Sequence, residues 1–113
     1  MSLKHQDPLL ERYGCSWDQF APALYRFACF LTHDREQAAL YLEQVFIGCW
    51  RNGKIRRVLG RHGKENGLRL MFYRDVWRRY SGFSGRDVRE LAELYLIHVQ
   101  HFPPLEARRI LRK

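Results

Sequence analysis

Apolar residues recur at helical spacing along most of the chain, and this periodicity constrains the fold more than any other feature of the sequence. The clearest stripe repeats at i, i+4, i+7, i+8 and i+11 and consists of Phe20, Leu24, Phe27, Ala28 and Leu31. No segment of comparable length alternates apolar and polar residues as a half-buried strand does. The 113 residues are 46% hydrophobic, enough for one core. We therefore predict an all-α fold, a compact bundle of three main helices plus a C-terminal helix and a short helical turn.

The first main helix is predicted over residues 17–31. Ser16 and Gln19 have the spacing of a capping box, in which each side chain satisfies a free backbone N–H of the other residue. Pro22 would strain the preceding turn of a helix that began at Ser16, so the expected start lies nearer Ala21.

The second main helix is predicted over residues 35–51. Asp34 and Gln37 repeat the capping-box spacing at its start. Gly53 provides a stop, because glycine tolerates the left-handed conformation that ends many helices. The apolar stripe of this helix is wider and consists of Ala38, Ala39, Leu42, Val45, Phe46, Cys49 and Trp50.

A basic, glycine-rich loop is predicted over residues 53–67, followed by the third main helix over 68–80. The inward face of this helix is expected to carry Leu68, Met71, Phe72, Val76 and Tyr80. A fourth helix is predicted over 86–101, with an inward face formed by Val88, Leu91, Leu94, Tyr95 and His98. Two prolines end it and begin a final helical turn or two over 105–113.

These elements suggest a division of the chain at residue 80. Residues 1–80 are expected to form one helical domain. Residues 81–113 are expected to be a linker with C-terminal helices, which either pack on that domain or start a second one.

Charge is distributed unevenly along the chain, whose net charge is +8 and whose pI is about 9.9. Residues 1–50 hold 4 basic and 6 acidic side chains, whereas residues 51–113 hold 16 basic and 6 acidic ones. The window 51–79 alone has a net charge of +8. Such an excess favours polyanionic partners, and the C-terminal half is where we expect them to bind.

Other features argue against several classes of protein. No apolar run approaches the length of a membrane span, and the N-terminal residues contain no signal-peptide core. Three cysteines without a close pair fit a reducing compartment, so we expect a cytoplasmic protein. His98 and His101 have helical ligand spacing, but no acidic or cysteine cluster joins them, and two partly buried histidines are the expected interpretation. We expect no enzyme activity, metal or cofactor.

The third helix carries the strongest functional signal. It combines arginines with aromatic rings, which neutralise phosphates and stack on unpaired bases in proteins that bind single strands. The alternative is a solvated basic face with Trp77 in the core.

Four segments, in this order, resemble bacterial sigma factors, especially the extracytoplasmic-function group. They are SWDQFAPALYRFACFLTHD at 16–34, AALYLEQVFIGCW at 38–50, LMFYRDVWRRY at 70–80, and residues 93–112 with HFPPLEARRILR. In that family the second segment docks on the clamp of RNA polymerase and the third reads and opens the −10 promoter element. The fourth resembles the entry into the family's second domain.

The resemblance implies two sets of site residues. Polymerase binding is expected at Leu40, Glu43, Gln44, Ile47 and Arg51. DNA binding is expected at Lys54, Arg56, Arg57, Arg61, Lys64, Arg74, Trp77, Arg78, Arg79 and Tyr80. The arginines would contact phosphate, and Trp77 or Tyr80 would pack or stack.

Three departures from the family keep other functions open. The family's clamp helix usually presents Asp and Gln where this chain has Leu40 and Glu43. The promoter-melting loop falls at about 52–67 and contains no Phe, Tyr or Trp, and residues 81–113 leave no room for the family's helix-turn-helix. One alternative is therefore a sigma-like interaction module, a decoy or co-regulator that binds an anti-sigma factor or polymerase without recognising a promoter. The other is a basic helical domain of unrelated function.

Overall fold

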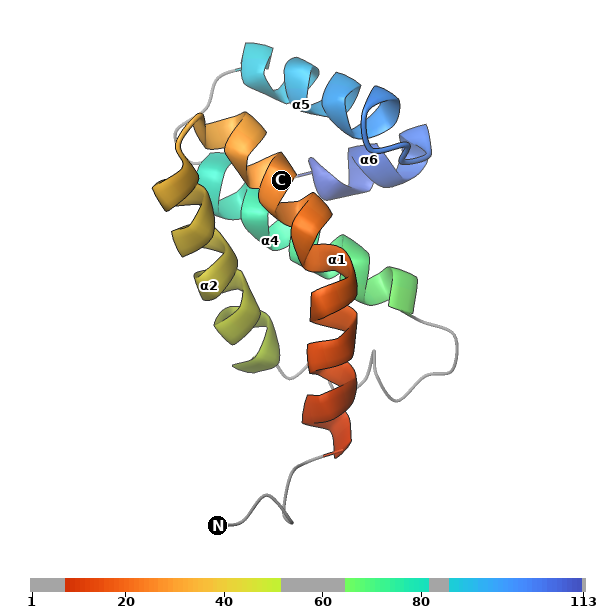
Figure 1. Ribbon diagram of the computed structural model, residues 1–113. Helices are drawn as coiled ribbons and strands as arrows, with labels where there is room; N and C mark the ends of the chain where they lie inside the picture. Colours follow the sequence, from red (N-terminus) through yellow and green to blue (C-terminus); the bar gives the residue numbers. More distant parts are fainter. Residues whose placement is uncertain (1–7, 52–64, 82–85, 113) are drawn as a thin grey trace.

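The computed structural model describes residues 8–51, 65–81 and 86–112, and every element in this part of the chain is a helix (Figure 1). The helices are α1 (Pro8–Thr32), α2 (Arg35–Arg51), α4 (Glu65–Ser81), α5 (Arg86–His98) and α6 (Pro104–Ile110). The predicted all-α fold is confirmed. None of the described helices is long and apolar enough to cross a membrane.

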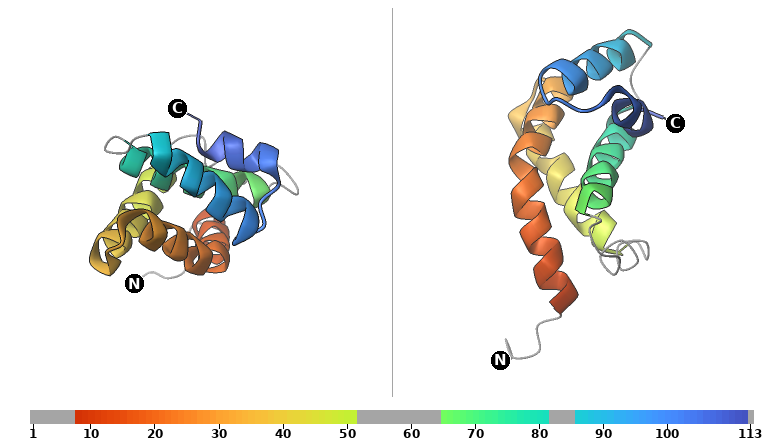
Figure 2. Two further views of the ribbon diagram at one scale, coloured as in Figure 1. Left: turned by 90° about the horizontal axis from the view of Figure 1, so that it is seen from above. Right: turned by 90° about the vertical axis from the view of Figure 1, so that its right-hand side faces the viewer.

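Helices α1, α2 and α4 pack against one another, and α5 and α6 cover one end of this group. Figure 2 shows α5 crossing the end of α1 that lies away from the N-terminus, with α6 beside α4. The long α1 gives the molecule its elongated shape, with principal extents of 49 × 30 × 22 Å.

Helix α1 begins much earlier than the sequence predicts. It starts at Pro8 and runs through Pro22, so the predicted start near Ala21 is wrong. Proline suits the first position of a helix, because the backbone N–H it lacks would have no partner there. Tyr13 and Ser16 extend the buried stripe by further turns, and this packing stabilises a helix that the internal proline alone would interrupt.

Helix α2 has the predicted bounds. The Asp34 side chain accepts hydrogen bonds from the backbone N–H groups of Glu36 at 2.9 Å and Gln37 at 3.2 Å, which is one half of the predicted capping box. The Asp34 N–H donates to the Thr32 hydroxyl oxygen at 3.2 Å instead of to the Gln37 side chain. Ala38, Val45 and Cys49 are buried as predicted. Ala39, which the predicted stripe included, is exposed.

Aromatic rings hold α1, α2 and α4 together around Tyr13. The Tyr13 ring lies 5.0 Å from that of Phe46, 5.2 Å from that of Trp50 and 5.7 Å from that of Phe72. Its hydroxyl donates a 2.6 Å hydrogen bond to the Phe46 carbonyl. Tyr13 thus joins α1 to α2 at a point before the predicted first helix of residues 17–31.

Helix α5 presents only part of the predicted face to the core, where Val88 and Tyr95 pack as predicted. Ala92 and Leu96 are fully buried, whereas Leu91 and Leu94 are 55% and 54% exposed and His98 is also exposed. Apolar residues stand three or four positions apart on both faces of this helix, so spacing alone could not distinguish them.

The end of α5 is also earlier than predicted, at His98 instead of residue 101. His101 adopts a left-handed conformation with φ 60°, and the Phe102 N–H donates to the Leu96 carbonyl at 2.9 Å. This turn brings Phe102 into the core, where its ring packs against that of Tyr73 in a T-shaped arrangement with the ring centres 4.8 Å apart. Pro104 then begins α6, as predicted.

Gln100 fixes this turn to the rest of the bundle. Its side-chain amide donates to the Ala23 carbonyl in α1 at 2.8 Å and accepts from the Tyr73 hydroxyl in α4 at 2.6 Å. One side chain therefore connects α1, α4 and the turn between α5 and α6.

Candidate functional site

One face of α2 is exposed to solvent and carries all five residues that the resemblance assigns to polymerase binding. They are Leu40, Glu43, Gln44, Ile47 and Arg51. Leu40 and Ile47 are 46% and 42% exposed, and they lie two turns apart on the same side of the helix. The face therefore offers apolar contact area with polar and charged neighbours, a composition typical of protein interfaces.

An apolar hollow of about 370 Å³ lies between α1 and α2, beside this face. Trp17 and Phe46 line it with their rings 5.0 Å apart, together with Leu42 and the acidic Asp18 and Glu43. Because Glu43 belongs both to the exposed face and to the hollow, the two form one continuous surface.

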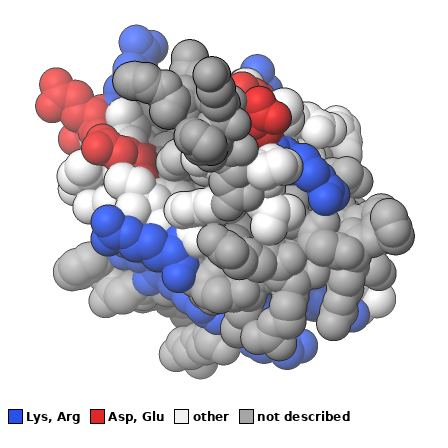
Figure 3. Space-filling model, turned by 90° about the horizontal axis from the view of Figure 1, so that it is seen from below, with Lys and Arg blue, Asp and Glu red and all other residues white. Residues whose placement is uncertain are grey.

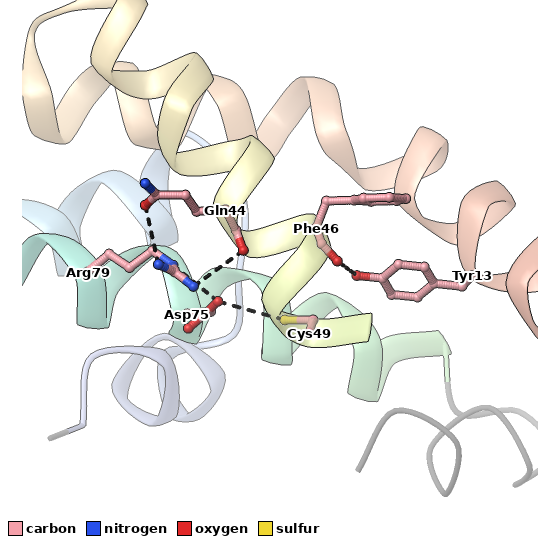
Figure 4. Close-up of polar contacts among 6 residues, drawn as sticks. All are labelled: Tyr13, Gln44, Phe46, Cys49, Asp75 and Arg79. Atoms are coloured by element: carbon pink, nitrogen blue, oxygen red, sulfur yellow. Dashed lines mark hydrogen bonds and ion pairs between the residues drawn. The ribbon is translucent and has the colours of Figure 1, made fainter. Parts of the chain in front are cut away.

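The four arginines of α4 divide into two pairs by what they contact. Arg79 donates from Nε to Asp75 at 3.3 Å and from its two terminal nitrogens to the side chain and backbone carbonyl of Gln44, at 3.2 and 3.3 Å (Figure 4). Arg69 lies 3.8 Å above the ring of Phe102. These two arginines tie α4 to α2 and to the turn before α6.

Gly48 leaves room for the end of the Arg79 side chain beside α2. A Cβ atom at this position would come within 2.9 Å of a terminal nitrogen of Arg79.

On the same side of α2, the Cys49 thiol faces the Asp75 carboxylate at 3.9 Å (Figure 4). Burial, and to a smaller extent the negative charge of Asp75, raises the pKa of the Cys49 thiol to about 12. The thiol therefore stays protonated at neutral pH.

Arg74 and Arg78 form the second pair, and neither has an ion pair among the described residues. Both line a cavity of about 160 Å³ between α2 and α4. The Nε atom of Arg74 is buried without a hydrogen-bond partner in the described part of the chain. Burial, followed by the positive charges of Arg78 and Arg112, lowers the pKa of Arg74.

Trp77, an aromatic residue of the predicted DNA site, lies deeper than the arginines of α4. Trp77 is only 3% exposed and belongs to the core, which is the packing role that the sequence analysis left open. Tyr80 is half-buried, with its ring centre 6.2 Å from that of Trp77. A base therefore has no exposed Trp77 face on which to stack.

The remaining candidates for DNA binding lie outside the described residues. They are Lys54, Arg56, Arg57, Arg61 and Lys64, all in the predicted basic loop.

Several residues of this region were not singled out from the sequence. The positive charge of Arg112, which follows α6 far along the chain, helps to lower the pKa of Arg74. Gly48 and Asp75 position Arg79. The three arginines within residues 108–112 were the available signal for Arg112, but its position relative to α4 depends on the turn at His101, which spacing does not reveal.

The two histidines of the fourth predicted helix do not share a helix. His98 is the last residue of α5 and His101 follows it with a left-handed backbone. No group of three or more potential metal ligands occurs in the described ranges.

Comparison with known proteins gives no relative: no family model, no curated protein and no solved structure matches the chain significantly.

Proposed function

We propose that this chain is a sigma-factor-like transcription regulator, a binding protein and not an enzyme, that contacts promoter DNA through the basic loop and α4 and RNA polymerase through α2. The observation that carries this proposal is the division of the α4 arginines. Arg69 and Arg79 are engaged within the protein, whereas Arg74 and Arg78 are left without a described partner in the most basic part of the chain. Unpaired arginines beside one another suit a phosphate backbone.

DNA binding is tested by fluorescence anisotropy with single-stranded and duplex oligonucleotides at salt concentrations from about 50 to 200 mM. The affinity is expected to fall steeply with salt, because each phosphate contact releases counterions. Replacing Arg74 and Arg78 together by alanine should weaken binding about tenfold or more and flatten the salt dependence.

Arg12→Ala is the matched control, since Arg12 is an exposed arginine of α1 in the acidic half of the chain. It should leave the affinity for DNA nearly unchanged. A wild-type affinity that does not depend on salt would overturn the DNA-binding part of the proposal.

Polymerase binding is tested by co-elution of the chain with core RNA polymerase from its source organism. Ile47→Asp places a charge on the exposed face of α2 and should abolish co-elution, because a buried unpaired charge in an interface is costly. Leu91→Asp changes an apolar residue on α5 that is even more exposed than Ile47, and it should have no effect. Equal behaviour of the two variants would contradict docking through α2.

The apolar hollow beside α2 supports a second candidate, a sigma-like interaction module without promoter recognition. Trp17 and Phe46, rimmed by Asp18 and Glu43, offer the buried aromatic contacts that dominate protein–protein affinity. Such a module would bind polymerase or an anti-sigma factor as a decoy or co-regulator. Retained polymerase binding in a chain that binds no DNA would favour it over the first candidate.

A further inference from the structure

A hollow of about 630 Å³ lies between α5 and α6. Its wall on the α6 side is a single stripe at i, i+3, i+4 and i+7, which runs along α6 and the turn that follows it. The stripe consists of Leu105, Arg108, Arg109 and Arg112. All four side chains are exposed, so the hollow opens to solvent along a whole face of this segment.

Buried residues hold the two helices in place behind the hollow. Ala92 and Leu96 of α5, and Ala107 and Ile110 of α6, have no exposed surface. The backbone N–H of Phe102 ties the turn between the helices to the Leu96 carbonyl at 2.9 Å. The fold therefore sets the shape of the hollow, and only its exposed side chains move when a ligand enters.

Arginine dominates the charge of this hollow. Four arginines and two glutamates line it, which gives it a net charge of +2. Arg108 lies 4.0 Å from Glu93, and both side chains are partly exposed, so this ion pair adds little stability. Arg89, Arg109 and Arg112 form no ion pair with any described residue. The hollow thus keeps positive charge that the fold does not use.

An exposed leucine lies among these arginines. Leu105 is 69% exposed, more than any other large hydrophobic side chain among the described residues. A leucine that stays in water adds little to the stability of the fold, whereas a partner that covered it would bury apolar surface. Apolar contact with arginine beside it is typical of protein interfaces.

The composition of the hollow favours an acidic segment of a protein over a nucleic acid. A phosphate backbone is a continuous row of negative charge, which the carboxylates of Glu90 and Glu93 would repel. It also has no apolar group to place on Leu105. A peptide carries its carboxylates at separate positions with apolar side chains between them, so it can pair with the arginines and also cover the leucine.

We propose that the hollow between α5 and α6 binds an acidic amphipathic helix of a partner protein. Its carboxylates pair with Arg109 and Arg112, and its apolar side chains cover Leu105. Arginine suits this task because its planar group can hold a carboxylate through two parallel hydrogen bonds. The inference is independent of the proposed DNA and polymerase binding, because none of these residues belongs to the sites on α2 and α4.

The test measures binding of a fluorescein-labelled peptide of about 15 residues by fluorescence anisotropy. The peptide carries Leu at positions three and four apart and Glu on the flanking positions, and the control peptide has Gln in place of every Glu. The wild-type chain should bind the acidic peptide at least about tenfold more tightly than the control peptide, because hydrogen bonds between ionised groups are the stronger ones.

A variant pair separates the hollow from the overall charge of the chain. Basic side chains also occur on the face of the molecule that Figure 3 shows from below, where acidic ones accompany them. Arg109→Gln should weaken binding of the acidic peptide about tenfold. Arg12→Gln removes the same charge from an exposed position near the start of α1 and should leave the affinity nearly unchanged. Equal losses in the two variants would overturn the site.

A second pair tests the apolar contact. Leu105→Ser should weaken binding of the acidic peptide about fivefold, because the peptide then covers no leucine. Leu94→Ser is the control, since Leu94 is 54% exposed on α5 and does not line the hollow. Both side chains are exposed, so neither change should affect folding. Equal affinities of the two variants for the peptide would rule out an amphipathic ligand at this place.

A single-stranded oligonucleotide, added as competitor, distinguishes the two classes of partner. Acidic peptide that stays bound in its presence supports the proposal. An oligonucleotide that displaces the peptide, and that also loses affinity in Arg109→Gln, would assign the hollow to nucleic acid and make the proposal wrong. If the wild-type chain does not bind the acidic peptide, the proposal falls, whatever the tests of DNA and polymerase binding show.

Discussion

Single side chains of one type perform different tasks in this molecule, and the arginines of α4 show it most directly. Arg79 spans two helices through three hydrogen-bonding interactions, whereas Arg78 is exposed in the cavity wall. Adjacent positions in the sequence thus separate a residue that stabilises the fold from one that is available to a ligand.

Alanine at each of these positions should separate the two tasks. Arg79→Ala should lower the free energy of unfolding by about 1 kcal/mol, since its contacts are charge-assisted but partly exposed to solvent. Arg78→Ala should change it by less than about 0.5 kcal/mol. Urea denaturation measures both, and equal losses in the two variants would contradict the assignment.

Backbone strain at His101 leads to a second prediction at this scale. Its φ of 60° is costly for a residue with a Cβ, and its side chain is exposed. His101→Gly should therefore raise the free energy of unfolding by about 0.5–1 kcal/mol.

His98→Gly serves as the control for this change. His98 is exposed and helical, so glycine there should lower the free energy of unfolding by up to about 1 kcal/mol. Thermal denaturation of the two variants measures these opposite changes in stability. A loss of stability in His101→Gly would show that the backbone of His101 is not strained.

At the scale of helices, the sequence predicted what local signals determine and missed what distant contacts determine. Helix α2 has the predicted bounds because the Asp34 cap lies next to it in the chain. The start of α1 was missed because Tyr13 is held by a residue 33 positions away. The buried face of α5 was only partly predicted, because the exposed Leu91 and Leu94, three positions apart, and the core residues Ala92 and Leu96, four positions apart, both have helical spacing.

In the candidate site, too, local signals could be read from the sequence and distant contacts could not. The exposed face of α2 could be predicted, since Leu40 and Ile47 stand two turns apart outside the apolar stripe. The burial of Trp77 could not be distinguished from a stacking role, because arginines surround it in the sequence. The position of Arg112 relative to α4 could not be predicted without the turn that reverses the chain before α6.

For the whole molecule, buried neutral groups predict a loss of stability in alkaline solution. Burial raises the pKa of the Tyr13 and Tyr73 hydroxyls well above their usual range and that of the Cys49 thiol to about 12. Between the unfolded and folded pKa values, the folded chain binds more protons than the unfolded chain. The free energy of unfolding should therefore fall as pH rises from about 9 to 12.

Urea denaturation at about pH 8 and about pH 10.5 measures this loss. Cys49→Ala removes one of the three groups, so the decrease between the two pH values should be smaller than in the wild-type chain, although the variant is less stable at both. A stability that does not change with pH in this range would contradict the burial of these groups.

The hydrogen bonds between Gln44 and Arg79 have a thermodynamic consequence for a chain with two binding faces. Gln44 lies on the exposed face of α2, yet its oxygens are the acceptors that hold Arg79 of α4. A protein partner that takes the Gln44 side chain would release one arm of Arg79 toward the cavity where phosphate is proposed to bind. Because linkage is reciprocal, phosphate that attracts Arg79 would free Gln44 for that partner, and each ligand would raise the affinity of the other by the same factor.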